Sequence, residues 1–452
     1  MNNTQPASAL ENVFGIRKEE FAAVAWSFVY FFCVLSSYYM LRSVRESMAA
    51  AVGASNIPWL FSGTFVAMLL VAPIFGWIAS RFPRRRFLPW IYYFFACNIL
   101  LFWFGFSSVE DKSVEFVRLG VVFFVWLSVF NLFVVSVFWS FMADIYTKSQ
   151  SRRVFGIISA GGSAGALLGP LANSELSVII GFQNLMPISA AILLLGVVCI
   201  SQLRKWVEAE HVEDIESTAA SEKPLGGSLW TGAIEIFRTR FLLIICGASI
   251  IASLLGTALY MFMIDLVAET VSTTDERTQV FARIDLATNL LAFFLQMFVV
   301  KQSVSRLGIG LTLAVLPFIS IIGFALLALN PAFIVIAILQ VVRRSVGFGL
   351  SKPSNDMLYS VVPTEQKYKS KNFIDTAIYR GGDLIGTWTI RALWSLGIPI
   401  ISLVLLPFAA IWVALAIWLG REYKRRDVAL SEAPVGAPST TNRPVIKEET
   451  NG

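Results

Sequence analysis

The chemistry that this sequence offers lies in charged side chains set inside apolar segments. The segment YYMLRSVRE ends the first long apolar run. At about 100° per residue its polar side chains fall on one arc of a helix, and they are Tyr38, Arg42, Arg45 and Glu46. Two guanidiniums and a phenol on one face suit an anion, because arginine binds phosphate or carboxylate with two parallel hydrogen bonds. The alternative is a helix end at the outer interface, with Arg42 paired to Glu46.

Two adjacent arginines form a second cluster, within the apolar stretch 336–356. Arg343 and Arg344 need an anion, carbonyl oxygens, water or a partner acid if they lie inside a membrane. The alternative is that the helix ends at Val342 and leaves both arginines in the cytoplasm. The apolar VGFGL that follows favours a location inside the membrane.

The third and strongest cluster is KYKSKNFIDTAIYRGGD (367–383). On a helical wheel one half-circle is polar, and it holds Lys371, Asn372, Asp375, Thr376, Tyr379, Arg380 and Asp383. One polar wall suits a helix that faces a cavity rather than lipid. The alternative is a structural ion-pair seam, for example between Arg380 and Asp383, which are three residues apart.

Isolated charges complete the set of candidates. Arg283 and Asp285 open one apolar run, where they are two residues apart and do not face each other directly. Asp285 either offsets a cavity arginine or serves as an acid near a helix start. Asp144 lies at the end of the fourth run.

The composition of the chain indicates that membrane-spanning helices carry these charges. The chain has 452 residues, of which 56 % are hydrophobic and 15 % charged, with a mean hydropathy of +0.69. A soluble domain of this length needs more charge to cover its interior, so we expect an integral membrane protein. About 20 apolar residues span a bilayer as a helix. The candidate spans are 20–44, 57–80, 87–107, 117–145, 154–173, 184–203, 241–267, 280–300, 309–329, 332–352, 373–395 and 397–420.

The spans divide into two groups of six around a charged segment. We expect the following units: a cytoplasmic N-terminal segment 1–19, a six-helix bundle 20–203, a linker 204–240, a second six-helix bundle 241–420 and a disordered tail 421–452. Most Lys and Arg residues between spans fall on one side, which predicts that both termini are cytoplasmic. We expect a bacterial inner membrane. This layout predicts an all-α membrane protein of twelve helices, the major facilitator fold, with a central cavity between two bundles.

Two motifs resemble signatures of major facilitator proteins. GWIASRFPRRR (76–86) is similar to their loop between the second and third helices, with Ser80 in place of an acid and Pro83 in place of a glycine. GIISAGGSAGALLGP (156–170) is similar to the fifth-helix signature of their antiporters. Positive-inside charge and small-residue packing are the alternatives. The predicted gating residues are Arg81, Arg84, Arg85, Asp144, Gly165, Gly169 and Pro170.

A more specific resemblance comes from KPSNDMLYSVV (352–362) and from 367–383. Both are similar to segments of the ATP/ADP-antiporter-type nucleotide transporters of plastids and intracellular bacteria, and 39–46 and 138–145 add weaker similarity. The resemblance implies exchange of nucleotides by alternating access. It also implies substrate or gating roles for the residues that match the family's charged positions, which are Arg45, Glu46, Lys371 and Arg380. Asn355 and Asp356 depart from the family, which often has a basic–acidic pair there.

These observations lead to one hypothesis and two alternatives. We predict a secondary active transporter of an anionic metabolite, with a nucleotide as the best guess for the substrate. Its cavity is lined by Arg45, Arg343, Arg344, Lys371 and Arg380, with Asp285, Asp375 and Asp383 as counter-charges. A proton-coupled exporter of drugs or another solute, and a membrane sensor without transport activity, are the alternatives.

Several partners and activities are not expected from the sequence. No Walker loop, dinucleotide fingerprint or hydrolase triad is present, so we expect neither an enzyme nor a cofactor. His211 is the only histidine and lies in a charged segment, which makes a metal site improbable. We expect the lipid bilayer and a small anion as partners, no nucleic acid, and a monomer.

Overall fold

The computed structural model describes residues 17, 19–81, 84–209, 236, 239–363, 366, 370–371 and 373–431, and the regular structure in these residues is helical. Ten helical stretches among them are long and apolar enough to cross a membrane. Two of these, Thr274–Leu329 and Tyr379–Leu430, each contain a glycine with φ of 78°, Gly308 and Gly397. Because a positive φ ends an α-helix, each of these two stretches divides into two helices. The described helices therefore agree with the twelve predicted spans and the all-α class.

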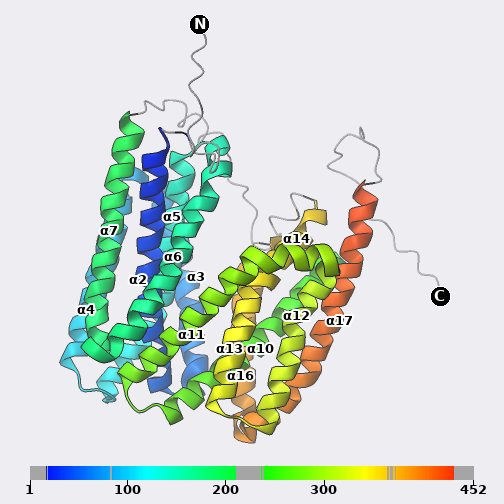
Figure 1. The fold of residues 1–452 in the computed structure, drawn as a ribbon. Helices are drawn as coiled ribbons and strands as arrows, with labels where there is room; N and C mark the ends of the chain where they lie inside the picture. Colours follow the sequence, from blue (N-terminus) through cyan, green and yellow to red (C-terminus); the bar gives the residue numbers. More distant parts are fainter. Residues whose placement is uncertain are drawn as a thin grey trace.

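Six long helices form the N-terminal half, which stands as an upright bundle on the left of Figure 1. They are α2 (Phe21–Val52), α3 (Ile57–Arg81), α4 (Arg84–Ser108), α5 (Val114–Ile145), α6 (Lys148–Ile180) and α7 (Phe182–Ala209).

The C-terminal half contains three π-helical turns that interrupt its α-helices. The first part consists of α10 (Arg240–Thr270), α11 (Thr274–Phe294), a π turn (Leu295–Val299) and α12 (Val300–Leu329). The second part consists of α13 (Phe333–Val346), a π turn (Gly347–Ser351), α14 (Lys352–Leu358), a π turn (Ile374–Ile378), α16 (Tyr379–Leu393) and α17 (Gly397–Ser431).

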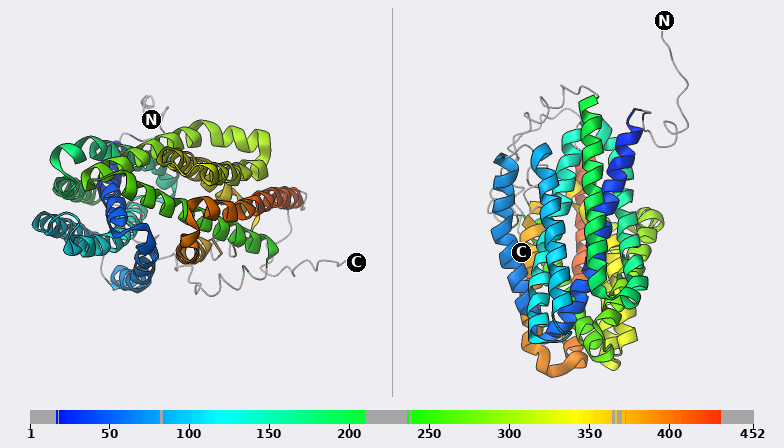
Figure 2. Two further views of the ribbon diagram at one scale, coloured as in Figure 1. Left: turned by 90° about the horizontal axis from the view of Figure 1, so that it is seen from below. Right: turned by 90° about the vertical axis from the view of Figure 1, so that its left-hand side faces the viewer.

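The two halves lie side by side and diverge toward one end of the molecule (Figures 1 and 2). At this end α2 begins, α7 ends and α10 begins, so we call it the linker end. At the opposite end the halves are hydrogen-bonded to each other. Ser47 Oγ donates to the carbonyl oxygen of Thr274 at 3.0 Å, and Thr274 Oγ1 donates to Asp111 at 2.8 Å. The backbone N–H of Phe182 donates to Asp275 at 2.7 Å.

Contacts between the halves also run along both sides of the molecule. On one side Asn289 Nδ2, on α11, donates to the carbonyl oxygen of Ala166, on α6, at 2.7 Å. On the other side Trp388 Nε1, on α16, donates to Ser62 Oγ, on α3, at 3.2 Å. The pairs α6–α11 and α3–α16 therefore form the lateral seams between the halves.

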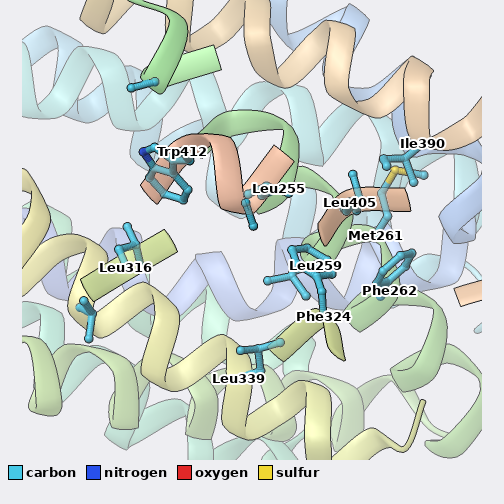
Figure 3. Close-up of a cluster of buried hydrophobic side chains, with 14 of the residues drawn as sticks. Leu255, Leu259, Met261, Phe262, Leu316, Phe324, Leu339, Ile390, Leu405 and Trp412 are labelled. Atoms are coloured by element: carbon cyan, nitrogen blue, oxygen red, sulfur yellow. The ribbon is translucent and has the colours of Figure 1, made fainter. Parts of the chain in front are cut away.

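Two apolar cores lie in the described part of the molecule, and the one centred on the C-terminal half extends into the N-terminal half through Ala49, Ala50, Ala54, Ile57, Leu60 and Phe124. In the C-terminal half, Leu259, Phe262, Phe324 and Leu339 are buried between α10, α12 and α13 (Figure 3). In the N-terminal half the core is rich in aromatic rings, such as Phe31 stacked on Phe138 with 4.2 Å between ring centroids.

Within the N-terminal half, α6 lies directly against the backbone of α2. A Cβ atom on Gly165 would lie 2.4 Å from the carbonyl oxygen of Phe32, and one on Gly169 would lie 2.7 Å from that of Ser36. Only glycine permits such an approach. Pro170 lies inside α6 and does not end it.

The ends of α2, α6 and α7 are tied together at the linker end. Arg153 donates to both carboxylate oxygens of Glu20, at 2.9 and 3.2 Å, and Gln150 Nε2 donates to the same carboxylate at 3.1 Å. Trp206 Nε1 donates to the carbonyl oxygen of Glu19 at 3.3 Å. These contacts hold the start of α2 to the start of α6 and the end of α7.

Two helices run further than the sequence predicts. The helix α7 continues to Ala209, past the predicted linker start at 204, and α17 continues to Ser431, past the predicted tail start at 421. Glu422 stabilises the extension of α17, because its carboxylate pairs with Arg425 at 2.9 Å and with Arg426 at 2.8 Å along the helix.

The predicted gating residues at the linker end are placed only in part. The helix α3 ends at Arg81 and α4 begins at Arg84, but the side chains of 72–87, including those of Arg81, Arg84 and Arg85, lie outside the described residues. Asp144 lies in the last turn of α5. The gating roles of these residues remain predictions.

We expect Gly165→Ala to lower the free energy of unfolding by about 1–3 kcal/mol, because the added methyl group forces α2 and α6 apart. Gly156→Ala is the matched control on the same helix. No atom lies within 4 Å of its added Cβ, so it is expected to leave stability unchanged or raise it slightly. Thermal unfolding of the purified protein, followed by tryptophan fluorescence, measures both. Equal effects of the two substitutions would show that the close α2–α6 contact is unimportant.

We expect the Glu20 contact to depend on pH. Burial raises the pKa of Glu20, but the hydrogen bonds from Arg153, the Arg17 N–H and Gln150 outweigh it, so its pKa lies below the ordinary 4.5. A lowered pKa in the folded state gives stability that is present above the unfolded pKa and is lost as the pH falls below it. The difference in unfolding temperature between the native protein and Glu20→Gln should therefore shrink from neutral pH to about pH 3.5. A constant difference would contradict this prediction.

Candidate functional site

One buried carboxylate lies between two guanidiniums from different halves of the protein. Asp285 Oδ1, on α11, lies 3.2 Å from Arg42 Nη1, on α2, and 2.8 Å from Arg344 Nη2, on α13. Asp285 is 2 % exposed, whereas the two arginine side chains are 16 % and 19 % exposed. Arg42 and Arg344 thus approach the same oxygen atom across the interface between the halves.

A second carboxylate, one helical turn from Arg42, completes the charged region. Glu46 lies 2.5 Å from Arg45 Nη2 and 3.8 Å from Arg42 Nε. Tyr260, on α10 of the other half, donates its hydroxyl to Glu46 at 2.6 Å. This second contact also crosses the interface between the halves.

Neighbouring residues hold the Arg45 side chain in place. Its guanidinium lies over the ring of Phe124, 4.9 Å from the ring centroid, and donates to Ser128 Oγ at 3.5 Å. Tyr38 is near enough to both Arg42 and Arg45 to interact with their charges. Together, Tyr38, Arg42, Arg45, Glu46, Tyr260, Asp285 and Arg344 form what we call the central cluster.

The central cluster contains more positive than negative charge. Three guanidiniums face two carboxylates, so three positive and two negative charges leave a net charge of +1. Within the described residues, Asp285 Oδ2 and Arg45 Nε have no hydrogen-bond partner. Buried ionised groups are stable only when they are paired and hydrogen-bonded. The surplus guanidinium and the unpartnered donor Arg45 Nε suit an additional anion, whereas the acceptor Asp285 Oδ2 does not.

Arg343 and Arg344 lie inside α13, which continues to Val346, and the helical stretch Phe333–Val361 is long and apolar enough to cross a membrane. The helix therefore does not end at Val342, and the location of both arginines inside the membrane stays a prediction. Adjacent helical residues point about 100° apart. Accordingly Arg344 faces Asp285, whereas Arg343 donates to the carbonyl oxygen of Ala252, on α10, at 3.0 Å.

The described residues of the third predicted cluster have different surroundings, and the predicted polar wall stays a prediction because Asn372, Asp375 and Thr376 have no described side chains. Asp383 accepts a hydrogen bond from Ser253 Oγ on α10, while Tyr379 and Arg380 are exposed. In the described part of the chain no ion pair within 4.0 Å joins Arg380 to Asp383. Lys371 pairs instead with Asp356, on α14, at 2.8 Å.

Two more predicted site residues, Asp375 and Arg283, are not shown to belong to the central cluster. Asp375 is in the π turn Ile374–Ile378, and its side chain is not among the described ones. Arg283 lines a separate apolar pocket with Ala337, Ile338 and Val341, on another face of α11 from Asp285.

The central cluster also contains a residue that sequence reasoning missed. Tyr260 lies in the middle of an apolar run and is uncharged, so a search for charged residues does not find it. Its hydroxyl group could have identified it, because a buried tyrosine O–H usually has a hydrogen-bond partner.

We expect Asp285→Asn to lower the free energy of unfolding by about 3–5 kcal/mol, because it leaves two guanidiniums facing each other without a counter-charge. Adding Arg344→Gln to this variant should restore part of the loss, since one of the unpaired charges is then removed. Asp356→Asn is the control at an exposed ion pair, where a change below about 1 kcal/mol is expected. Thermal unfolding of the two single variants and the double variant measures these changes in stability. Additive effects of Asp285→Asn and Arg344→Gln would contradict a shared interaction.

Comparison with known proteins identifies the fold and the family. Residues 26–386 match the family model of the Major Facilitator Superfamily. "ADP,ATP carrier protein 2" of Chlamydia pneumoniae is 21 % identical over an alignment that covers 96 % of this chain and 94 % of that protein.

Solved transporter structures share the fold at low sequence identity. The nucleoside transporter NupG has a TM-score of 0.56 and 17 % identity, with 90 % of this chain and 100 % of that chain covered. A bacterial homologue of the human lysosomal transporter Spinster, in an inward-facing and unoccupied conformation, has a TM-score of 0.56 and 11 % identity, with 91 % and 99 % covered. The chain therefore belongs to the Major Facilitator Superfamily and is a multi-pass membrane transporter rather than an enzyme.

Proposed function

We propose that this transporter exchanges an anionic, phosphorylated metabolite by alternating access, and that a nucleotide is its best-supported substrate. The observation that carries the proposal is the Asp285 carboxylate shared between Arg42 and Arg344, which come from opposite halves. A phosphate group competes directly with Asp285 for these guanidiniums, because arginine binds phosphate oxygens in the same two-pronged way as carboxylate oxygens.

Competition for the guanidiniums links substrate binding to movement of the halves. The central cluster has a surplus positive charge, so an entering anion gains electrostatic attraction in a region of low dielectric constant. An anion that binds Arg42 and Arg344 weakens their hold on Asp285. The contact between the halves then changes with occupancy, as alternating access requires.

The arrangement of contacts between the halves supports an inward-facing state. The hydrogen bonds that Ser47 and Thr274 donate, and the one that Asp275 accepts from the Phe182 N–H, close the end opposite the linker. The excess of Lys and Arg near the linker end supports a cytoplasmic location for that end. We propose that both termini are cytoplasmic, that the protein lies in a bacterial inner membrane, and that it acts as a monomer.

Three similarities favour a nucleotide among possible anions. The relative from Chlamydia pneumoniae is described as an ADP,ATP carrier, and NupG is described as a nucleoside transporter. The segments 352–362 and 367–383 resemble nucleotide transporters as well. These similarities are distant, so the shared central charge remains the main argument for an anion.

A proton-coupled transporter is the second candidate, and Asp383 is the observation that favours it. This carboxylate is hydrogen-bonded to Ser253 and has no ion-pair partner within 4.0 Å in the described part of the chain. A carboxylate without a counter-ion in a membrane span can take up a proton. Dependence of uptake on an imposed pH gradient would favour this candidate over exchange.

We expect Arg42→Gln and Arg344→Gln each to reduce nucleotide exchange about tenfold or more, because each removes a charged hydrogen-bond donor from the phosphate site. Arg283→Gln is the matched control on α11, since Arg283 lines a different pocket and should tolerate the change. Counterflow of labelled ADP in proteoliposomes, with competing sugar phosphates and organic acids, measures the effect. Absence of exchange for all of these anions in the native protein would refute the proposal.

A further inference from the structure

A pocket of about 270 Å³ lies between the two halves, next to the central cluster. Its walls come from α2 and α6 in one half, and from α11 and the π turns Leu295–Val299 and Gly347–Ser351 in the other. Tyr39 connects the pocket to the cluster, because its side chain lines the pocket while the Arg42 guanidinium lies over its ring, 5.6 Å from the ring centroid.

The helical register places the pocket on the linker side of the charges. Tyr39 lies three residues before Arg42 on α2, which begins at the linker end. Asn289 lies four residues after Asp285 on α11, and Phe348 lies four residues after Arg344; these chain segments run toward the linker end. Because a helix rises 1.5 Å per residue, each charged residue has a pocket residue about one turn, roughly 4.5–6 Å, closer to that end.

The pocket combines aromatic faces with uncharged hydrogen-bonding groups. Phe293 and Phe348 are 38 % and 53 % exposed, and both line the pocket. Asn289 and Gln296 add amide groups to the same wall. Asn289 Nδ2 donates to the carbonyl oxygen of Ala166, which holds this side chain at the wall of the pocket. A planar heteroaromatic ring suits a pocket of this kind, since the ring stacks on aromatic side chains and forms hydrogen bonds at its edge.

The size of the pocket limits what part of a ligand it can hold. Sites that enclose a whole drug-sized molecule have volumes of about 300–1,000 Å³. At about 270 Å³ this pocket suits a ring system whose charged remainder lies outside it. The Arg42–Asp285–Arg344 charges lie one turn away, in the direction in which that remainder would extend.

We propose that this pocket binds the heteroaromatic ring of the substrate, while the phosphates of the same molecule bind the central cluster. The site then selects nucleotides over phosphates that carry no ring. This inference rests on the proposed function, because it requires the guanidiniums to bind phosphate. It adds a second, uncharged subsite contributed by both halves.

Ligand protection of the purified protein against heat tests the two subsites separately. Adenosine probes the ring subsite alone, pyrophosphate probes the charged subsite alone, and ADP probes both. In the native protein all three are expected to raise the unfolding temperature, with ADP effective at the lowest concentration.

Substitutions should separate the two responses. Phe293→Ala and Phe348→Ala are expected to raise the concentrations of adenosine and ADP needed for half-maximal protection about tenfold, and to leave pyrophosphate unchanged. Arg344→Gln should weaken pyrophosphate and ADP but not adenosine. Phe294→Ala is the matched control, because Phe294 is adjacent on α11, is 49 % exposed and does not line the pocket.

Each of the other possible results contradicts a specific part of the proposal. Protection by pyrophosphate but not by adenosine overturns the ring subsite and leaves the proposed function standing; this is also the result expected if a lipid chain fills the pocket. Loss of pyrophosphate protection in Phe293→Ala and Phe348→Ala shows that the pocket residues act only through structure. Absence of protection by all three ligands in the native protein removes both the inference and the proposed function.

Discussion

The pairing of one carboxylate with two guanidiniums is the interaction on which the centre of this transporter depends. Asp285 is almost fully buried, and its partners Arg42 and Arg344 belong to different halves. Removing charges from water is costly, so three charged groups persist here only while they compensate one another. Any ligand that satisfies the guanidiniums instead must change the contact between the halves. Under the proposed function, substrate binding and the coupling of the two halves therefore depend on the same atoms.

This coupling requires each half to move as a unit, and the packing of α2 meets that requirement. Gly165 and Gly169 bring α6 against the backbone of α2, and Arg153 fixes the start of α2 through Glu20. Arg42 consequently cannot shift without the rest of its half. At the end opposite the linker the halves are joined by hydrogen bonds and by buried apolar side chains such as Ala49, Ala54 and Ile57. A change of state must separate these contacts as well as the central ion pairs.

The sequence predicts the helical class, the family and part of the central cluster, but not how the charges pair. A helical wheel shows which side chains share a face of one helix, and it found Arg42, Glu46 and Arg344. It does not show which helix lies opposite, so Tyr260 and the pocket beside Tyr39 were missed. The wheel also assumes a regular 3.6-residue period. The π turn Ile374–Ile378 rotates the residues that follow it, which explains why Lys371 and Asp383 contact different helices.

Under the proposed function, the surplus charge of the central cluster has a consequence for the mode of transport. Without an anion, Asp285 holds Arg42 and Arg344 together and stabilises the state in which the halves are joined. A bound phosphate replaces the carboxylate on the guanidiniums and lowers the cost of separating them. The loaded protein then changes state more readily than the empty one, in both directions. A carrier whose form without an anion changes state slowly returns only with a second anion, and we propose on this ground that the charge pairing favours exchange over net transport.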